Sequence, residues 1–128
     1  MKVQYVHELA AYQEAFRLQQ KIFEQSKSWP KEETYSLIDQ VRRSSRSIGA
    51  NLSEAWAKRR YPAHFISKLT DADAELSETR HWIATAQACA YLRPNEVAAL
   101  NALADAVGAL CGGMIQKYRQ FCLPDPLA

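Results

Sequence analysis

Apolar residues recur at alternating steps of three and four along most of the chain, which is the spacing of one face of an α-helix. The pattern is clearest between residues 30 and 60, and the stretches 62–92 and 95–121 repeat it. A broader apolar face runs through residues 8–27. We therefore predict four helices, over residues 8–27, 30–59, 62–92 and 95–121. The inward positions of the second helix are Ile38, Val41, Ser45, Ile48, Leu52 and Ala55.

The same spacing predicts the buried face of each other helix. In the first helix the inward positions are Leu9, Tyr12, Phe16 and Phe23, with Ala15, Leu18 and Ile22 beside them. In the third they are Phe65, Leu69, Ala72, Leu76, Thr79, Ile83, Ala86 and Ala90. In the fourth they are Val97, Leu100, Ala104, Val107, Cys111, Met114, Tyr118 and Phe121.

Three prolines, Pro30, Pro62 and Pro94, mark the starts of the second, third and fourth helices, because proline fits a first helical turn. Their equal spacing predicts that the second and third helices have the same length. Short connections between such helices make antiparallel neighbours. We predict an all-α fold, an antiparallel up-down-up-down four-helix bundle that occupies residues 1–128 as one domain.

The fourth helix is apolar on most of its circumference. Between residues 97 and 115 the clearly polar side chains are Asn101 and Asp105. A membrane span is one interpretation, but a mid-helix aspartate costs a few kcal/mol in lipid, and Gly108, Gly112 and Gly113 weaken a helix in water. The pattern favours a helix with one side in the core and the other against a second subunit. We expect a homo-oligomer and no membrane partner.

Composition is that of a globular protein: of 128 residues, 48% are apolar and 23% are charged. Three cysteines with no close pair form neither a disulfide framework nor a metal-ligand spacing, which indicates a reduced compartment. The N-terminal residues lack the apolar core of a secretory signal. We therefore expect a cytoplasmic protein.

Charge is distributed unevenly along the chain. The whole chain carries +2, yet residues 1–60 hold eleven basic and seven acidic groups, and residues 61–128 hold five and seven. Between residues 42 and 60 there are six basic side chains and one acid, Glu54. A surface that attracts an anion is therefore expected in the first half.

The basic residues of the second helix and the turn after it are the main candidate site. Cations interleaved with aromatic rings suit phosphate contact and base stacking. One alternative is a solvated face with ion pairs from Asp39 to Arg42 or Arg43. Another is a set of subunit salt bridges to Asp71, Asp73 or Glu75. The candidate nucleic-acid-binding residues are Arg42, Arg43, Arg46, Trp56, Lys58, Arg59, Arg60 and Tyr61.

Polar residues among small ones suggest tight helix contacts. Asn51 and Glu54 lie near Ser47, Gly49 and Ala50, and such groups usually bond across a close contact and fix its register. A direct role in binding a ligand is the alternative. We expect Asn51 and Glu54, together with Glu78 of the third helix, to be structural.

No arrangement typical of an enzyme is present. The pair Glu78 and His81 has the spacing used in four-helix di-iron proteins, but those need a second such pair, and the chain has none. Cys111 falls on an apolar seam, where a thiol behaves as a small apolar group. There is no glycine-rich phosphate loop or nucleophile elbow. We predict no metal, no cofactor and no enzymatic activity.

The stretch QVRRSSRSIGANLSEA, residues 40–55, resembles the bacterial four-helix-bundle proteins encoded by intervening sequences in large-subunit ribosomal RNA genes. The chain departs from that pattern at Tyr12, Ala55, Ala74 and Glu75. The positions that carry the resemblance are Pro30, Glu33, Leu37, Gln40, Arg42, Arg43, Ser47, Ile48, Asn51 and Glu54, followed by Phe65, Leu69, Ala72 and Glu78.

The resemblance implies a homopentamer with no known enzymatic activity. It also implies kinship with accessory proteins of diversity-generating retroelements, which bind nucleic acid and a reverse transcriptase. We therefore expect a non-enzymatic scaffold or accessory protein that binds RNA or DNA through the basic face of the second helix. The alternative is a protein-interaction scaffold whose arginines are used in subunit contacts and which has no nucleic-acid ligand.

Overall fold

The computed structural model describes residues 3–124, and within them the fold is all-α with no strand. The four long helices that the periodicity predicts are present. They are α1 (Ala10–Ser26), α2 (Leu37–Ala57), α3 (Pro62–Ala88) and α4 (Pro94–Gln116). Shorter elements are the 3₁₀ turns Val6–Glu8 and Lys31–Glu33, and the one-turn helix α5 (Tyr118–Phe121).

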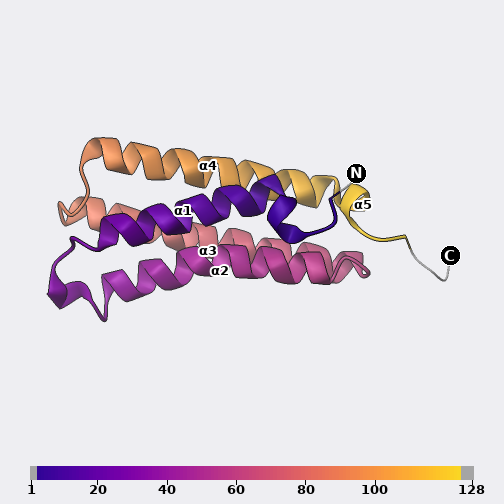
Figure 1. The fold of residues 1–128 in the computed structure, drawn as a ribbon, viewed down its shortest axis with the longest axis horizontal. Coiled ribbons are helices and arrows are strands. Elements are labelled where there is room, and N and C mark those ends of the chain that lie inside the picture. Colours follow the sequence, from indigo (N-terminus) through magenta and orange to yellow (C-terminus); the bar gives the residue numbers. More distant parts are fainter. Residues whose placement is uncertain (1–2, 125–128) are drawn as a thin grey trace.

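The long helices lie side by side, and after each connection the chain returns along the helix before it (Figure 1). Each helix packs on two others, in the closed order α1, α2, α3, α4 and back to α1. Hydrogen bonds tie the ends together. Trp56 Nε1 donates to the carbonyl of Gln4 (3.2 Å), and the amide of Leu123 donates to the carbonyl of Arg59 (3.1 Å).

The core follows the predicted seams of α2, α3 and α4. All six inward positions of α2 are buried, and so are the inward positions of α3 from Phe65 to Ala86 and of α4 from Val97 to Met114. Each large side chain taken from water contributes about 1.5–3 kcal/mol. The largest fully buried ones are Phe65, Leu18, Ile22, Ile48, Leu52, Leu69, Ile83 and Leu100.

The first helix is rotated relative to the prediction. Its buried positions after Leu9 are Ala11, Ala15, Leu18, Ile22 and Ser26. Phe16 is 46% exposed, and Tyr12 and Phe23 are half-buried. Neighbouring residues are about 100° apart around a helix, so a line through 12, 16 and 23 faces the flank beside α2 when 11, 15 and 22 face the core.

The second helix begins at Leu37, not at Pro30 as predicted, because local side-chain bonds compete with helix there. Thr34 Oγ1 donates to the carbonyl of Lys31 (2.7 Å), and Ser36 Oγ donates to Glu33 (2.6 Å). Ser36 is not helical, with φ −124° and ψ −99°. The prediction of equal lengths is therefore wrong: α2 has 21 residues and α3 has 27.

The third helix ends four residues earlier than predicted, in a left-handed residue. Ala90 has a φ of 62°. The amide of Tyr91 donates to the carbonyl of Ala86 (2.9 Å), and the amide of Ala90 donates to the carbonyl of Gln87 (3.0 Å). This is a Schellman motif, in which glycine is the usual left-handed residue. Ala90 is therefore exposed and does not continue the seam. The fourth helix likewise ends at Gln116, and residues 118–121 form the separate turn α5.

Candidate nucleic-acid interface

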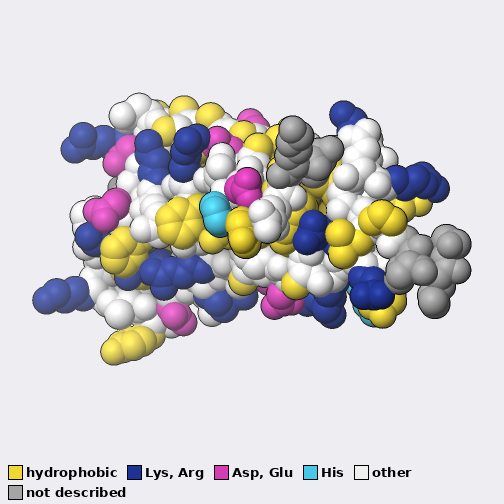
Figure 2. All heavy atoms as spheres, turned by 45° about the vertical axis from the view of Figure 1, so that its right-hand side comes forward, with side chains coloured by type: hydrophobic (Ala, Val, Ile, Leu, Met, Phe, Trp, Pro, Cys, Tyr) yellow, Lys and Arg dark blue, Asp and Glu magenta, His cyan; other side chains and the backbone are white. Residues whose placement is uncertain are grey.

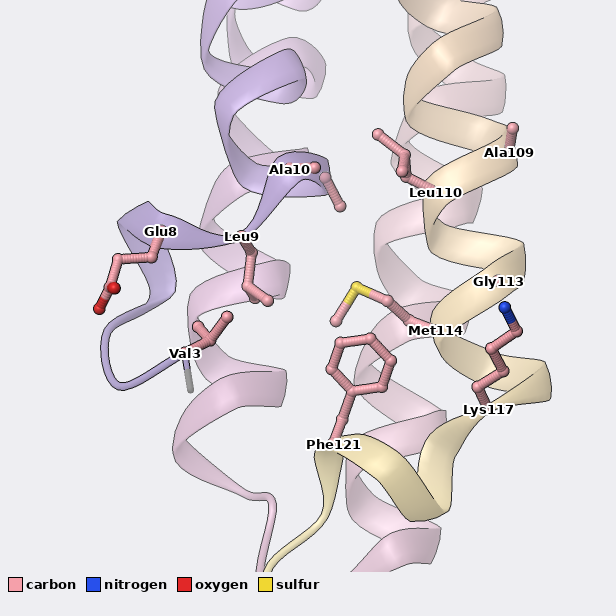
Figure 3. Close-up of a pocket in the computed structure, with 11 residues that line it drawn as sticks. Val3, Glu8, Leu9, Ala10, Ala109, Leu110, Gly113, Met114, Lys117 and Phe121 are labelled. Carbon is pink, nitrogen blue, oxygen red and sulfur yellow. The ribbon is translucent and has the colours of Figure 1, made fainter. Parts of the chain in front are cut away.

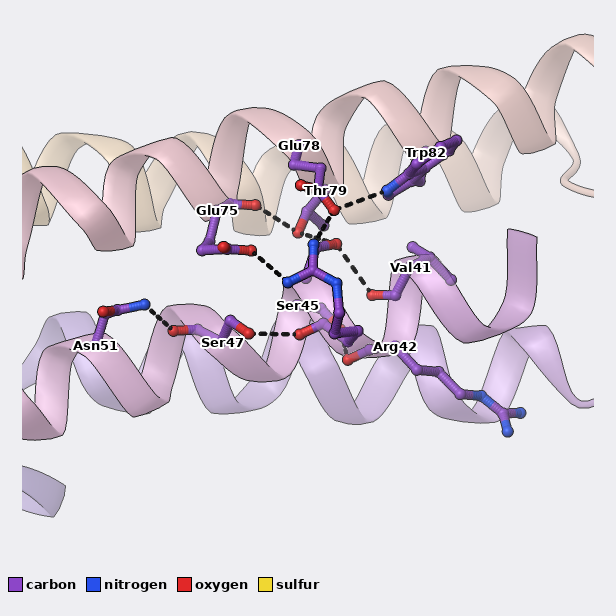
Figure 4. A network of polar contacts seen from close by, with 11 residues as sticks. Val41, Arg42, Ser45, Ser47, Asn51, Glu75, Glu78, Thr79 and Trp82 are labelled. Atoms are coloured by element: carbon purple, nitrogen blue, oxygen red, sulfur yellow. Dashed lines mark hydrogen bonds and ion pairs between the residues drawn. The ribbon is translucent and has the colours of Figure 1, made fainter. Parts of the chain in front are cut away.

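The arginines of α2 diverge to different neighbours. Arg42 extends toward α1, where its Nε donates to Ser26 Oγ (2.9 Å) and its guanidinium lies 4.7 Å from the centroid of the Phe23 ring. Figure 4 shows Arg42 pointing away from the residues of α3. Its partners are neutral, so its positive charge is not cancelled by the contact.

Three cations surround the half-buried Phe23 ring. Besides Arg42, the guanidinium of Arg46 lies 5.6 Å from the ring centroid and the ammonium of Lys27 lies 4.7 Å from it. Lys27 also pairs with Glu24 (3.2 Å). Within residues 3–124 no carboxylate lies within ion-pair distance of Arg42 or Arg46. We call Phe23, Lys27, Arg42 and Arg46 the Phe23 cluster.

Arg43, the next residue, points the other way and is neutralised. Its guanidinium pairs with Glu78 and with Glu75 (3.4 Å), both on α3 (Figure 4). Glu78 also accepts a hydrogen bond from Trp82 Nε1 (3.1 Å). Two contacts hold the pKa of Glu78 below its usual range. The hydrogen bond from Trp82 has the larger effect, and the contact with Arg43 has the smaller one. The predicted pairs from Asp39 to Arg42 or Arg43 do not form.

Further polar contacts join α2 to α3. Glu54 pairs with Lys68 (2.6 Å), which lowers the pKa of the carboxyl and raises that of the ammonium. In the interior, Thr79 Oγ1 bonds to Ser44 Oγ (2.9 Å). Asn51, expected to bond across a helix contact, instead donates to the carbonyl of Ser47 in its own helix (2.9 Å; Figure 4).

The end of α2 differs from the predicted stacking site. Trp56 is 7% exposed, so it belongs to the core and its ring cannot take a base. The guanidinium of Arg59 lies 3.6 Å from the centroid of that ring and donates to the Trp56 carbonyl (2.8 Å). Partial burial lowers the pKa of Arg59. Tyr61 is 55% exposed and lies beside His64.

The basic residues predicted to form one site on the second helix and the turn after it therefore lie in two separate places. Lys58 and Arg60 are exposed at the turn after α2. At a rise of about 1.5 Å per residue, the twelve positions from Arg46 to Lys58 span about 18 Å. The structure brings Arg42 and Arg46 together on Phe23 and separates them from Arg43 and from the turn.

Sequence reasoning missed the contribution of α1. Phe23 and Lys27 are absent from the predicted site, because the apolar spacing of the first helix assigns Phe23 to the core. The available signal was the position of Ala11, Ala15, Leu18 and Ile22, which form a tighter helical line than the aromatic residues do. Small and aliphatic residues face the crowded bundle interior, and the aromatic rings lie on its flank.

Other reactive groups have structural surroundings. Burial raises the pKa of the Cys111 thiol to about 11, so it is not a thiolate nucleophile at neutral pH. Within residues 3–124 no three His, Cys, Asp or Glu side chains converge as metal ligands. A cavity of about 300 Å³ opens between the start of α1 and the end of α4, and Leu9, Leu110, Met114 and Phe121 point into it (Figure 3).

The outer face of α4 is largely apolar, and no other helix within residues 3–124 covers it. The exposed positions in its central part are Ala98, Ala102, Asp105, Ala109 and Gly112. Asp105 pairs with Arg80 of α3 (2.9 Å). By length and composition α4 is apolar enough to cross a bilayer, and 28% of its most apolar 18-residue stretch is buried. Ala109 belongs both to this face and to the lining of the cavity.

Comparison with known protein families shows which family has this sequence pattern. The model of the 23S rRNA-intervening sequence protein family matches residues 7–113, which include all of the interface described above and nearly all of α4. The chain belongs to the 23S rRNA-intervening sequence protein family. The resemblance inferred from residues 40–55 is thus confirmed.

A solved structure has the same fold. It is a protein of unknown function from the S23 ribosomal protein family of Bacteroides thetaiotaomicron VPI-5482, with a TM-score of 0.75 and 25% sequence identity. The match covers 84% of this chain and 96% of that one. No curated protein matches the chain. For this member of the intervening sequence protein family, function must therefore be argued from its own surface.

Proposed function

We propose that the protein is a non-enzymatic, cytoplasmic scaffold that assembles from several copies of an antiparallel bundle and binds RNA through the face between α1 and α2. The observation that carries RNA binding is the Phe23 cluster. Arg42 and Arg46 lie against an aromatic ring, and Arg42 also bonds the neutral Ser26 hydroxyl, without a carboxylate in ion-pair range of either arginine within residues 3–124. Guanidinium groups that keep their charge on a surface are the usual phosphate contacts of nucleic-acid-binding proteins.

Lys58 and Arg60 extend this interface at the turn after α2. Both are exposed, and neither lies within ion-pair distance of a carboxylate in residues 3–124. Repetition of two separate cationic points on each copy would strengthen binding through avidity. Arg43 does not belong to the interface, because Glu75 and Glu78 neutralise it.

The test is RNA binding at several salt concentrations. A labelled single-stranded RNA, a hairpin RNA and a duplex DNA are titrated with the protein between about 50 and about 200 mM salt. We expect binding to both RNAs whose log affinity falls steeply with log salt, because several phosphates are neutralised. Absence of RNA binding at low salt would reject the proposed function. Tighter binding to duplex DNA than to either RNA would mean that the ligand is DNA and not RNA.

Self-assembly is supported by the outer face of α4. Asp105 near its middle disfavours a bilayer span, and an apolar face of this length is normally covered in a water-soluble protein. The small residues would allow a helix of a second copy to approach closely. The resemblance to pentameric relatives makes five copies the expected number.

Assembly is tested with a matched pair of substitutions. Ala102→Arg places a large cation on the exposed face of α4, and Ala57→Arg places the same side chain at an exposed position of α2. We expect Ala102→Arg to reduce the mass measured by light scattering to that of a folded protomer, and Ala57→Arg to leave the assembly intact. A monomeric wild-type protein would reject the assembly.

The alternative function is a protein-interaction scaffold without a nucleic-acid ligand, which would use the arginines in subunit contacts. Arg43 and Lys68 are used in contacts between α2 and α3. These contacts lie within one protomer, so they stabilise the bundle and say nothing of a subunit interface. Loss of assembly on removal of Arg46, with no RNA binding by the wild type, would support this alternative.

A further inference from the structure

We propose that an open hollow on α1 holds an unstacked nucleobase of single-stranded RNA. The inference rests on the proposed RNA-binding function and adds a second part to the same face. The hollow has a volume of about 410 Å³ and is lined by His7, Tyr12, Gln13, Phe16 and Arg17. Its walls are aromatic rings, and its rim carries hydrogen-bonding groups.

The rings are placed to stack with a flat ligand. Tyr12 and Phe16 are stacked with centroids 6.1 Å apart and an angle of 30° between their planes. Phe16 is 46% exposed, so one side of the pair faces solvent. Tyr12 is supported from behind by α2, since a Cβ added to Gly49 would lie 3.6 Å from Tyr12 Cε2. A base that covers Phe16 would bury apolar surface that the protomer leaves in water.

The rim offers groups that can bond the edge of a base. Gln13 Nε2 donates to the carbonyl of His7 (3.0 Å), which fixes an amide carrying both a donor and an acceptor beside the rings. Arg17 pairs with Glu14 (2.6 Å), and its side chain is 66% exposed. His7 in turn stacks on Tyr5, with ring centroids 5.6 Å apart.

The charges nearby indicate a nucleic acid as the occupant. Phe16 and Phe23 are seven residues apart on α1, a distance of about 10.5 Å along the helix axis. A strand with one base in the hollow can therefore reach Arg42 and Arg46 with a neighbouring phosphate. On the face seen in Figure 2, Lys and Arg side chains and exposed hydrophobic side chains are interleaved. An apolar peptide would gain nothing from these cations.

The same geometry favours a single strand over a duplex. Bases in a duplex are paired and stacked on each other, whereas those of a single strand can be turned out onto aromatic side chains. Such stacking tolerates any base, because every base has an aromatic face. We therefore expect weak sequence preference at this hollow.

The experiment compares two labelled RNA probes of equal charge, a uridine octamer and an octamer of the same length whose nucleotides lack bases. Wild-type protein should bind the uridine octamer about tenfold more tightly, because one stacked base contributes on that order. Phe16→Ala should abolish this preference while leaving the salt dependence of binding unchanged. Tyr35→Ala, at a ring that is 93% exposed and outside the hollow, is the matched control and should keep the preference.

The outcomes separate this inference from the function on which it rests. Equal binding of both probes by the wild type, with a steep salt dependence, would overturn the hollow and keep RNA binding. A preference that survives Phe16→Ala would also overturn it. If neither probe binds, the RNA-binding function fails and the hollow fails with it. If Phe16→Ala lowers the mass of the assembly without changing the preference for bases, the hollow is a contact between copies instead.

Discussion

The two sides of α2 use the same residue type for opposite purposes. On the side toward α1, Arg42 and Arg46 lie on the Phe23 ring, and Arg42 also bonds the Ser26 hydroxyl. On the side toward α3, Arg43 lies between two carboxylates, and Glu54 bonds Lys68. Adjacent positions in the sequence thus supply one charge that remains available and one that is cancelled.

The difference shows what each side is suited for. Exposed ion pairs contribute about 0–1 kcal/mol each, so the α2–α3 contacts chiefly fix how the two helices lie against each other. A guanidinium held on a ring is positioned without losing its charge, and its Coulomb field still reaches a phosphate. The α1–α2 side is therefore the better candidate for a ligand, although the sequence of α2 alone does not distinguish its three arginines from one another.

The largest expected effect comes from removing the available charges. The double variant Arg42→Gln/Arg46→Gln should bind single-stranded RNA about tenfold more weakly, and the slope of log affinity against log salt should fall by about 1.4, since each single-strand phosphate contact contributes about 0.7. Fluorescence anisotropy at several salt concentrations measures both quantities.

The matched control removes two charges that are already neutralised. Arg43→Gln/Lys68→Gln has the same net charge as the first double variant, and it should keep both the affinity and the slope near the wild-type values. Equal losses in the two double variants would mean that only net charge matters, and the distinction between the two sides of α2 would be wrong.

The second effect concerns the interior of the α2–α3 side. Thr79→Val removes the hydroxyl that bonds Ser44 and the carbonyl of Glu75 (2.8 Å) while keeping the shape of the side chain. A buried hydrogen-bonded hydroxyl contributes about 1–2 kcal/mol, so the free energy of unfolding measured in urea should fall by that amount. Thr70→Val, where the hydroxyl is exposed and bonds its own helix at Ser67, should change it by less than about 0.5 kcal/mol. Similar losses in both variants would show that the buried bond adds nothing.

A third change, remote from both sides, separates stability from binding. Ala90 has a left-handed backbone that costs a residue with a Cβ about 1 kcal/mol. Ala90→Gly should raise the free energy of unfolding by about that amount and leave RNA affinity unchanged. Ala88→Gly, two residues earlier and still helical, should lower it. If RNA affinity followed stability in these variants, the losses expected for the arginine variants would need another explanation.

Much of the fold could be predicted from the sequence because burial repeats at helical spacing. The seams of α2, α3 and α4 were predicted almost residue by residue. The start of α2 could not be, since it depends on side-chain bonds of Thr34 and Ser36 that propensity does not distinguish from a first helical turn. The left-handed residue at the end of α3 is an alanine, so the usual glycine signal is missing.

The candidate site was predicted only in part. The choice of α2 as the basic element stays a prediction, and the roles given to individual residues changed. The sequence around Trp56 predicts an exposed ring, because its neighbours in the chain are small and charged residues. Tertiary packing nevertheless buries it. Whether a given arginine meets a ring or a carboxylate depends on which residues of α1 and α3 lie opposite, and one helix's sequence does not contain that information.

The smallest expected effect tests whether the α2–α3 side responds to acid. The Trp82 bond and Arg43 hold the pKa of Glu78 below that of the unfolded chain, so this carboxylate adds stability above about pH 4.5, and that stability is lost as the pH falls below it. Urea unfolding at pH 6 and pH 3 should show a smaller acid loss for Glu78→Gln than for the wild type. The Glu78 side chain is 37% exposed, so the difference should stay under about 1 kcal/mol.

Arg42→Gln should leave the acid loss as it is in the wild type, because Arg42 bonds a hydroxyl and not a carboxylate. A change in Arg42→Gln equal to that in Glu78→Gln would mean that the two sides of α2 share one set of charges after all.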